Sequence, residues 1–320
     1  MAAFGAGTLA FPLLAFPTPR VKKVRRLGIL QPGAPPQPLA DAIKEGMSQL
    51  GYVEGRDVVF ETRWAEGRAD KLNAGAAGLV AAKVDVITTL SSPAALAARR
   101  ATSTIPIVFT GVGDPVGIGI VESLAHPGGN ATGFASLTTE LSAKRLQLLH
   151  QVAPQMTRFA MLWNDTNPSM SISASRAEGA ASSLGLTVQS LGVHDLVDFD
   201  PSFAAIRAGN SSGMLTLADP FTNANRKRIV DFAARSRLPA IYETREFVEA
   251  GGLMSYGPNL AAIQRRSATY IDKIFKGAKP GDLPVELPTE FELIINMKTA
   301  RALGIAFSES ILARADEVID

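Results

Sequence analysis

The glycine-rich stretch FTGVGDPVGIGIVESLAHPGGNATGF, residues 109–134, is the segment whose residue types and spacing most invite a chemical interpretation. It follows the apolar run IPIVF, as a phosphate-binding loop follows a strand. A dinucleotide fingerprint requires G-x-G-x-x-G, but here the spacing of Gly111, Gly113 and Gly117 puts the third glycine one residue late. The stretch also follows the fourth predicted strand, whereas the fingerprint opens the first βα unit. We therefore expect this loop to serve a ligand other than a dinucleotide.

Other catalytic patterns are missing from the sequence. It contains neither a Walker A segment nor a G-x-S-x-G segment, and the absence of cysteine removes thiol nucleophiles and Cys-ligated zinc. The three histidines, His126, His150 and His194, form no close ligand pair. Residues far apart in a chain can still converge in space, so an enzyme stays an alternative. We predict no catalytic residues, no metal and no cofactor.

Polar residues follow nearly every predicted strand, at the edge where open parallel sheets bind ligands. Hydroxyls, amides, carboxylates and phenols can hydrogen-bond a small polar solute or stack on a planar one, but they are poorly suited to activating water. For any single serine or asparagine among them, helix capping is an equally good explanation, so the prediction rests on the set. The predicted ligand-binding residues are Gln31, Ser91, Ser92, Thr110, Gly111, Asp114, Asn164, Asn167, Asp219, Tyr242 and Tyr256.

The elements that position these residues alternate between short apolar strands and longer amphipathic helices, a pattern typical of parallel sheets covered by helices on both faces. The pattern begins at residue 24 and starts again near residue 138, and 320 residues exceed what one simple core usually supports. A helix over residues 258–277, a linker and a late strand then follow. We expect two lobes that the chain crosses more than once: 24–134 plus 251–285, and 135–250 plus 286–320.

Composition narrows the class of partner. The net charge of +2 on 320 residues gives no electrostatic case for nucleic acid. The first 16 residues, MAAFGAGTLAFPLLAF, resemble the hydrophobic core of an export signal that lacks its basic start. They are too short and too rich in glycine and proline for a convincing membrane span. We expect residues 1–23 to lie outside the fold, and a start site placed too far downstream would explain the missing basic residues.

Five sequence segments resemble a known protein family. They are RRLGIL, LGYVEGRDV, VGDPVGIGIVESLAHPGGNATGF, LPAIYETREFVEAGGLMSYGPNL and KGAKPGDLPVELPTEFELIINMKTARALGI. Together they resemble the tryptophan-type ABC transporter solute-binding proteins over about residues 24–320, and the likeness is specific because ordered phrases agree. The resemblance implies a periplasmic-binding-protein type I (flytrap) fold, α/β, with two Rossmann-like lobes, parallel sheets and three hinge crossings.

The same resemblance implies a function. We expect an exported, periplasmic and monomeric protein that traps a small polar, amino-acid-like solute and delivers it to an ABC permease in the inner membrane. Some family members are similar to receptors for aromatic amino acids. For such a solute, Asp219 or Asp114 would pair with the ammonium and Tyr242 or Tyr256 would flank a ring. The alternatives are a ligand-sensing receptor domain for a membrane sensor and, third, a two-lobed α/β enzyme.

Overall fold

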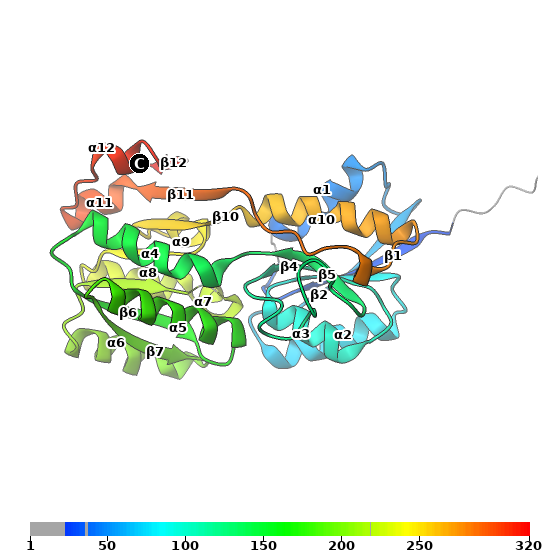
Figure 1. Ribbon diagram of the computed structural model, residues 1–320, viewed down its shortest axis with the longest axis horizontal. Coiled ribbons are helices and arrows are strands. Elements are labelled where there is room, and N and C mark those ends of the chain that lie inside the picture. The colour runs from blue at the N-terminus through cyan, green and yellow to red at the C-terminus, as the bar shows by residue number, and fades with distance from the viewer. Residues whose placement is uncertain (1–22, 36–37, 218) are drawn as a thin grey trace, which may run out of the picture.

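A computed structural model of the chain describes residues 23–35, 38–217 and 219–320. It contains two lobes, each built around one sheet, which lie side by side along the longest axis of the molecule (Figure 1). The export-like segment predicted from the sequence lies outside the described residues, except for Lys23, whose ammonium pairs with Asp85 at 2.5 Å. Within the described ranges, no helix has the length and apolar character needed to cross a membrane.

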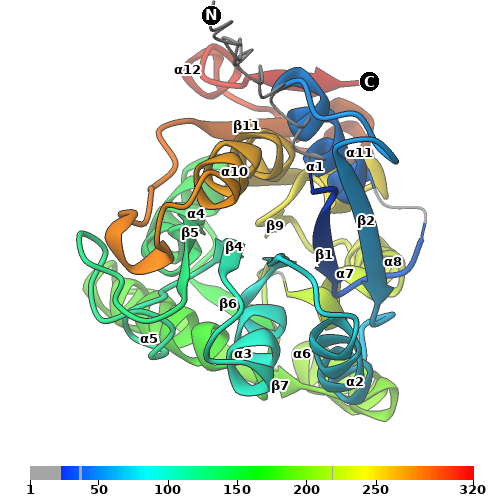
Figure 2. The ribbon, with the colours of Figure 1, turned by 90° about the vertical axis from the view of Figure 1, so that its right-hand side faces the viewer.

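The first lobe is a five-stranded parallel sheet in the order β2-β1-β3-β4-β5. Helices α1 and α10 cover one face, and α2 and α3 cover the other (Figure 2). The late helix predicted from the sequence is α10, and its side chains Ile263 and Tyr270 are buried against this sheet. The elements are β1 (Arg25–Gln31), α1 (Pro38–Gln49), β2 (Val58–Trp64), α2 (Ala69–Ala81), β3 (Val86–Leu90), α3 (Ser92–Ala101), β4 (Ile107–Val112), β5 (Ala131–Ala135), α10 (Leu260–Phe275) and the 3-10 turn η2 (Pro280–Asp282).

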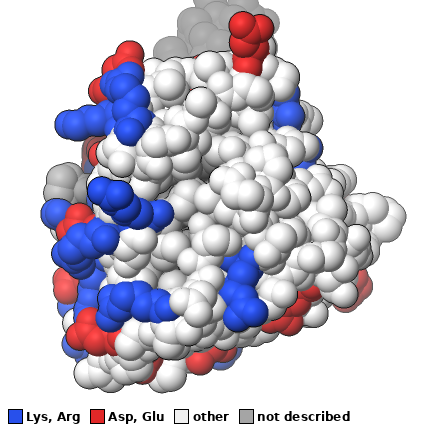
Figure 3. Space-filling model, turned by 90° about the vertical axis from the view of Figure 1, so that its left-hand side faces the viewer, with Lys and Arg blue, Asp and Glu red and all other residues white. Residues whose placement is uncertain are grey.

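The second lobe is a seven-stranded sheet in the order β12-β11-β10-β9-β8-β6-β7, parallel except where β10 meets β11. Helices α4, α5, α11 and α12 pack on one face, and α6, α8 and α9 on the other. The outer end of this lobe presents a broad uncharged area with charged side chains gathered toward its edges (Figure 3). The elements are α4 (Thr138–Val152), β6 (Arg158–Asn164), α5 (Pro168–Ser183), β7 (Thr187–Val193), η1 (Leu196–Asp198), α6 (Phe199–Ala208), β8 (Gly213–Thr216), α7 (Pro220–Ala224), α8 (Arg226–Arg235), β9 (Ala240–Tyr242), α9 (Arg245–Glu249), β10 (Met254–Pro258), β11 (Phe291–Asn296), α11 (Met297–Leu303), α12 (Glu309–Leu312) and β12 (Glu317–Ile319).

The chain crosses between the lobes three times, as the fold class predicted. It passes from β5 to α4, from β10 to α10, and from a segment paired with β5 to β11. One expected boundary differs. Residues 254–258 were placed in the first lobe, but β10 pairs with β9 and β11 of the second. The sequence GGLMSYG indicates a strand but does not indicate which strands it pairs with. Met254 is buried in the core of the second lobe, and this burial places the strand in the second sheet.

Gly133 shows why the first crossing needs glycine. Its φ is +151°, and a Cβ atom there would lie 1.9 Å from the carbonyl oxygen of Phe109 on the neighbouring strand. Only a residue without a side chain allows β5 to lie this close to β4 at the hinge. Gly128 and Gly129 in the same glycine-rich stretch also have positive φ, at +67° and +54°.

Candidate ligand-binding cleft

A cavity of about 420 Å³ lies between the lobes, at the carboxyl ends of the strands. The first lobe lines it with residues that follow β1, β2, β3 and β4, and the second lobe with residues that follow β6, β8 and β9. Its volume is that of a typical small-molecule site. Because both lobes contribute to the wall, the cavity forms only when they come together.

On the first lobe, the cavity meets the amino-terminal end of α3. Ser91 and Ser92 both line it. Ser91 has a φ of +82°, unusual for a residue with a side chain, and its amide donates to the carbonyl of Thr110 at 2.9 Å. Its hydroxyl is buried and has no hydrogen-bond partner among the described residues. Free amides and the partial positive charge at a helix start attract anions, so this wall suits a carboxylate.

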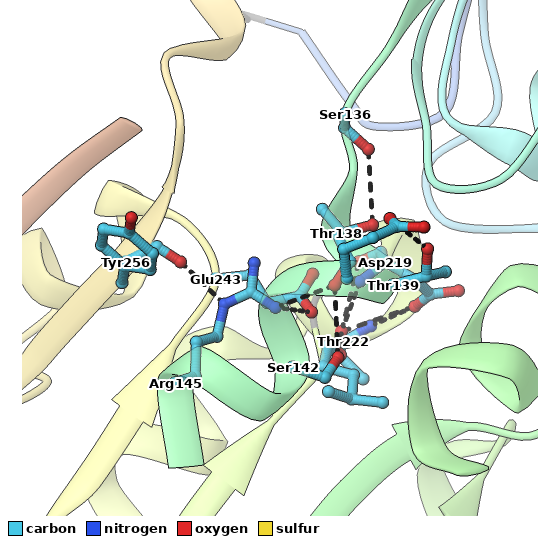
Figure 4. Close-up of polar contacts among 11 residues, drawn as sticks. Ser136, Thr138, Thr139, Ser142, Arg145, Asp219, Thr222, Glu243 and Tyr256 are labelled. Carbon is cyan, nitrogen blue, oxygen red and sulfur yellow. Dashed lines mark hydrogen bonds and ion pairs between the residues drawn. The ribbon is translucent and has the colours of Figure 1, made fainter. Parts of the chain in front are cut away.

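On the second lobe, the cavity is lined by the buried carboxylate of Asp219, which caps α7 (Figure 4). One oxygen accepts from the amides of Phe221 at 2.9 Å and Thr222 at 3.0 Å. The other accepts from Asn164 at 2.6 Å and Asn167 at 3.4 Å. Burial raises the pKa of Asp219, and these hydrogen bonds oppose that rise. None of the ion pairs among the described residues includes this carboxylate, so the wall suits an ammonium group.

Where the crossings enter the second lobe, a buried arginine joins them to the cavity. Arg145 on α4 donates from Nη1 to Glu243 at 2.7 Å and to the carbonyl of Thr138 at 3.2 Å, and from Nε to the carbonyl of Tyr256 at 2.7 Å (Figure 4). Burial lowers the pKa of Arg145, while the Glu243 carboxylate raises it. Glu243 and Thr138 both line the cavity. One side chain therefore connects the cavity wall to the first crossing and to the strand that leads into the second.

The two lobes touch at separate places around the cavity. The hydroxyls of Ser92 on α3 and Ser169 on α5 are hydrogen-bonded at 2.8 Å. The carboxylate of Asp114 lies 3.9 Å from the guanidinium of Arg176, which also pairs with a carboxylate of its own lobe. Across the cleft, a Cβ on Gly67 would lie 3.5 Å from that of Ala224. These contacts show the protein in a closed arrangement.

Five of the residues predicted from the sequence line the cavity: Ser91, Ser92, Gly111, Asn167 and Asp219. Two others lie next to it with different roles. Asn164 is buried and donates to Asp219, so it positions that carboxylate. Asp114 accepts from the amide of Gly117 and faces Arg176 at the contact between the lobes.

The remaining four differ from the prediction, because alternate residues of a strand face opposite sides. Gln31 is fully buried, and the Thr110 hydroxyl donates to the carbonyl of Thr89 at 2.9 Å. Tyr242 stacks on Phe247 inside the second core with ring centroids 4.7 Å apart, and its next neighbour Glu243 faces the cavity instead. Tyr256 packs against the other side of that lobe and gives the site only its carbonyl.

Sequence reasoning missed several lining residues. Glu243 and Thr244 directly follow the strand AIY, so the strand-end rule applied one residue later would have found them. Asn223 and Glu246 lie within short helices, where nothing in the sequence marks the side facing the cleft. The role of Arg145 behind the cavity wall could not be predicted either, since a charged residue on an amphipathic helix is normally exposed.

Two lobes that clasp a small-molecule cavity, joined by three crossings, define a solute-binding protein of the flytrap type. Residues 37–319 match the family model for ABC transporter substrate binding proteins, and the chain belongs to that family. Proteins of this family act outside the cytoplasm and deliver a small-molecule solute to an ABC transporter.

Three relatives show how far the likeness extends. A protein of Clostridioides difficile strain R20291 described as a tyrosine-binding protein is 26% identical over 288 residues, which cover 89% of this chain and 82% of the relative. The crystal structure of a conserved domain protein from Vibrio cholerae superposes with a TM-score of 0.87 at 27% identity, covering 92% of this chain and all of that one. An ABC domain from Streptococcus pneumoniae in complex with L-Trp gives 0.86 at 24% identity, with coverage of 93% and 100%.

Proposed function

We propose that this protein is the periplasmic, monomeric receptor of an ABC importer and that its solute is an amino acid or a similar zwitterion. The observation that carries this proposal is Asp219, a buried carboxylate that lines the cavity and forms no ion pair within the described part of the chain. An isolated buried charge is costly, and a ligand ammonium lowers that cost. Without such a ligand, the amides of Asn164 and Asn167 only partly compensate it.

The opposite wall supplies the complementary group. The start of α3 offers a carboxylate the unpaired hydroxyl of Ser91 and the partial positive charge of the helix end. A zwitterion that bridges the cleft contacts both lobes at once, with its carboxylate on the first and its ammonium on the second. Such a ligand stabilises the closed form through the contacts that exist only when the lobes meet.

The rest of the wall fits an apolar side chain. Leu39, Leu90, Met170 and Leu260 line the cavity together with several prolines. The names of two relatives, a tyrosine-binding protein and an L-Trp complex, support an amino acid with a large side chain. Micromolar binding would correspond to about −8 kcal/mol, net of the cost of closure. The closed protein then delivers its solute to a permease in the inner membrane.

The proposal is tested by calorimetry and thermal shift against a panel of the standard amino acids, purines and sugars. At least one amino acid should stabilise the protein and bind without being converted. Asp219→Asn should weaken that binding at least about tenfold, since it removes the carboxylate proposed to pair with the ammonium. Asp231→Asn, an exposed aspartate paired with Lys227 on α8, is the matched control and should change little. If no amino acid binds, or if the bound one emerges chemically altered, the proposal is wrong.

A further inference from the structure

The cavity wall contains hydrogen-bonding groups that the described residues leave unsatisfied. Four side-chain atoms that line it are buried yet have no hydrogen-bond partner among the described residues: Ser91 Oγ, Asn223 Oδ1, Thr244 Oγ1 and Glu246 Oε2. Folded proteins pair more than about nine in ten buried polar groups, so a cluster of exceptions in one cavity needs a reason. Ser91 belongs to the wall assigned above to the ligand carboxylate. The other three all belong to the second lobe.

The three unpaired atoms of the second lobe can all accept a hydrogen bond. A carboxylate oxygen and an amide carbonyl oxygen only accept hydrogen bonds, and the threonine hydroxyl can accept as well as donate. Asn223 lies on α7 and Glu246 in the first turn of α9, while Thr244 precedes α9. They surround the cavity from the loops after two adjacent strands, β8 and β9. This part of the wall is therefore complementary to a ligand group that donates hydrogen bonds.

The charges of the cavity lead to the same conclusion. Of its four carboxylates, Glu66 pairs with Lys71 and Glu243 with Arg145. Asp219 is assigned to the ligand ammonium, which leaves Glu246 with no ion pair in the described ranges. Arg226 also lines the cavity, but its guanidinium donates to the backbone carbonyl of Asn223. A ligand with only one cationic end leaves this half-buried carboxylate, one oxygen of which is shielded from solvent, without a charged partner.

We propose that the ligand's side chain carries a hydrogen-bond donor, and that Asn223, Thr244 and Glu246 recognise it. This inference rests on the proposed function and specifies its solute. The shared chemistry is an N–H or O–H group at the end of an apolar stem, either neutral, as in a phenol, or cationic, as in an alkylammonium. A site built to hydrogen-bond such a group discriminates strongly against the analogue that lacks it, because its own buried acceptors then stay unpaired.

Two ligand pairs test the inference on the full-length protein by calorimetry. Tyrosine and phenylalanine differ by one hydroxyl, and lysine and norleucine differ by one terminal ammonium. In at least one pair, the donor-bearing member should bind about tenfold tighter or more, and the pair that shows this tells a neutral donor from a cationic one. If the donor-free member binds within about twofold of its partner in both pairs, the inference is wrong.

A substitution separates specificity from general binding. Glu246→Gln replaces one acceptor oxygen with a donor at constant size, so it should remove most of the preference within the discriminating pair. The readout is the ratio of the two affinities within the pair, so a general loss of binding is not mistaken for a loss of preference. Glu249→Gln, on the exposed side of the same helix and paired with Arg245, is the control and should keep the preference. Unchanged discrimination in the Glu246 variant overturns the inference while leaving the proposed function standing. Failure of every amino acid to bind overturns the proposed function itself.

Discussion

The guanidinium of Arg145 donates to the carboxylate of Glu243 across 2.7 Å, with both side chains almost completely shielded from solvent. The pair joins α4, where the first crossing ends, to a residue in the cavity wall, and the same arginine binds the carbonyl of Tyr256 shortly before the second crossing. A buried charge removed from its partner is expensive. Arg145 therefore ties the ends of two crossings to the ligand-binding surface of the second lobe.

Replacing Arg145 with methionine should destabilise the protein by about 3–5 kcal/mol, because the buried carboxylate of Glu243 then loses its ion pair with Arg145. Urea denaturation measures this change. The double variant Arg145→Met with Glu243→Met should recover part of the loss, since no charge stays unpaired. Arg301→Met, at an exposed pair with Asp320, should cost less than about 1 kcal/mol. A single Arg145 variant as stable as the exposed control contradicts this account.

The sequence predicts the architecture well because periodicity is a local property. The alternation of strands and helices and the late helix α10 both follow from short segments. What cannot be predicted is how strands and side chains pair over long distances. β10 joins the second sheet through partners that its own residues do not specify, and Tyr242 faces inward while Glu243 faces the cavity. Arg145 acquires its role only through contacts about a hundred residues away.

Gly133→Ala should be among the most damaging single-methyl additions to this chain. The new Cβ would lie 1.9 Å from the Phe109 carbonyl oxygen, and β4 and β5 would have to separate at the first crossing. Gly119→Ala is the matched control, because Gly119 also has a positive φ, +72°, but has no atom within 4 Å of its Cβ position. The control should cost about 1–2 kcal/mol from backbone strain alone, and Gly133→Ala clearly more. Equal losses by denaturant unfolding would show that the close approach is unimportant.

Ser169→Ala should weaken ligand binding without destabilising either lobe. The Ser169 hydroxyl bonds to Ser92 across the closed cleft at 2.8 Å, so the substitution removes a contact that only the closed form makes. A hydrogen bond of this kind contributes about 0.5–1.5 kcal/mol, equivalent to a two- to tenfold loss of affinity. Calorimetry with the solute found in the panel gives the affinity, and unfolding of the ligand-free protein should be unchanged. Ser171→Ala on the exposed side of α5 is the control. Equal affinities in the two variants would count against closure through this contact.

The ligand-induced rise in melting temperature should increase with pH because of Asp219. Burial raises the pKa of this carboxyl in the folded, ligand-free protein, so the stability that it contributes is fully present below its unfolded pKa of about 3.9. That stability is lost as the pH rises through the higher folded pKa. A ligand ammonium binds the ionised form, so ligand stabilisation grows over the same interval.

The measurement is the difference in melting temperature with and without the bound amino acid, recorded from about pH 4 upward. Taking the difference removes the titration of carboxylates that the ligand does not contact. Asp219→Asn should show a smaller difference that varies less with pH, because the carboxyl proposed to pair with the ammonium no longer titrates. Asp231→Asn should reproduce the rise seen in the unmodified protein. A pH-independent difference in the unmodified protein would show that Asp219 is not the partner of the ligand's cation.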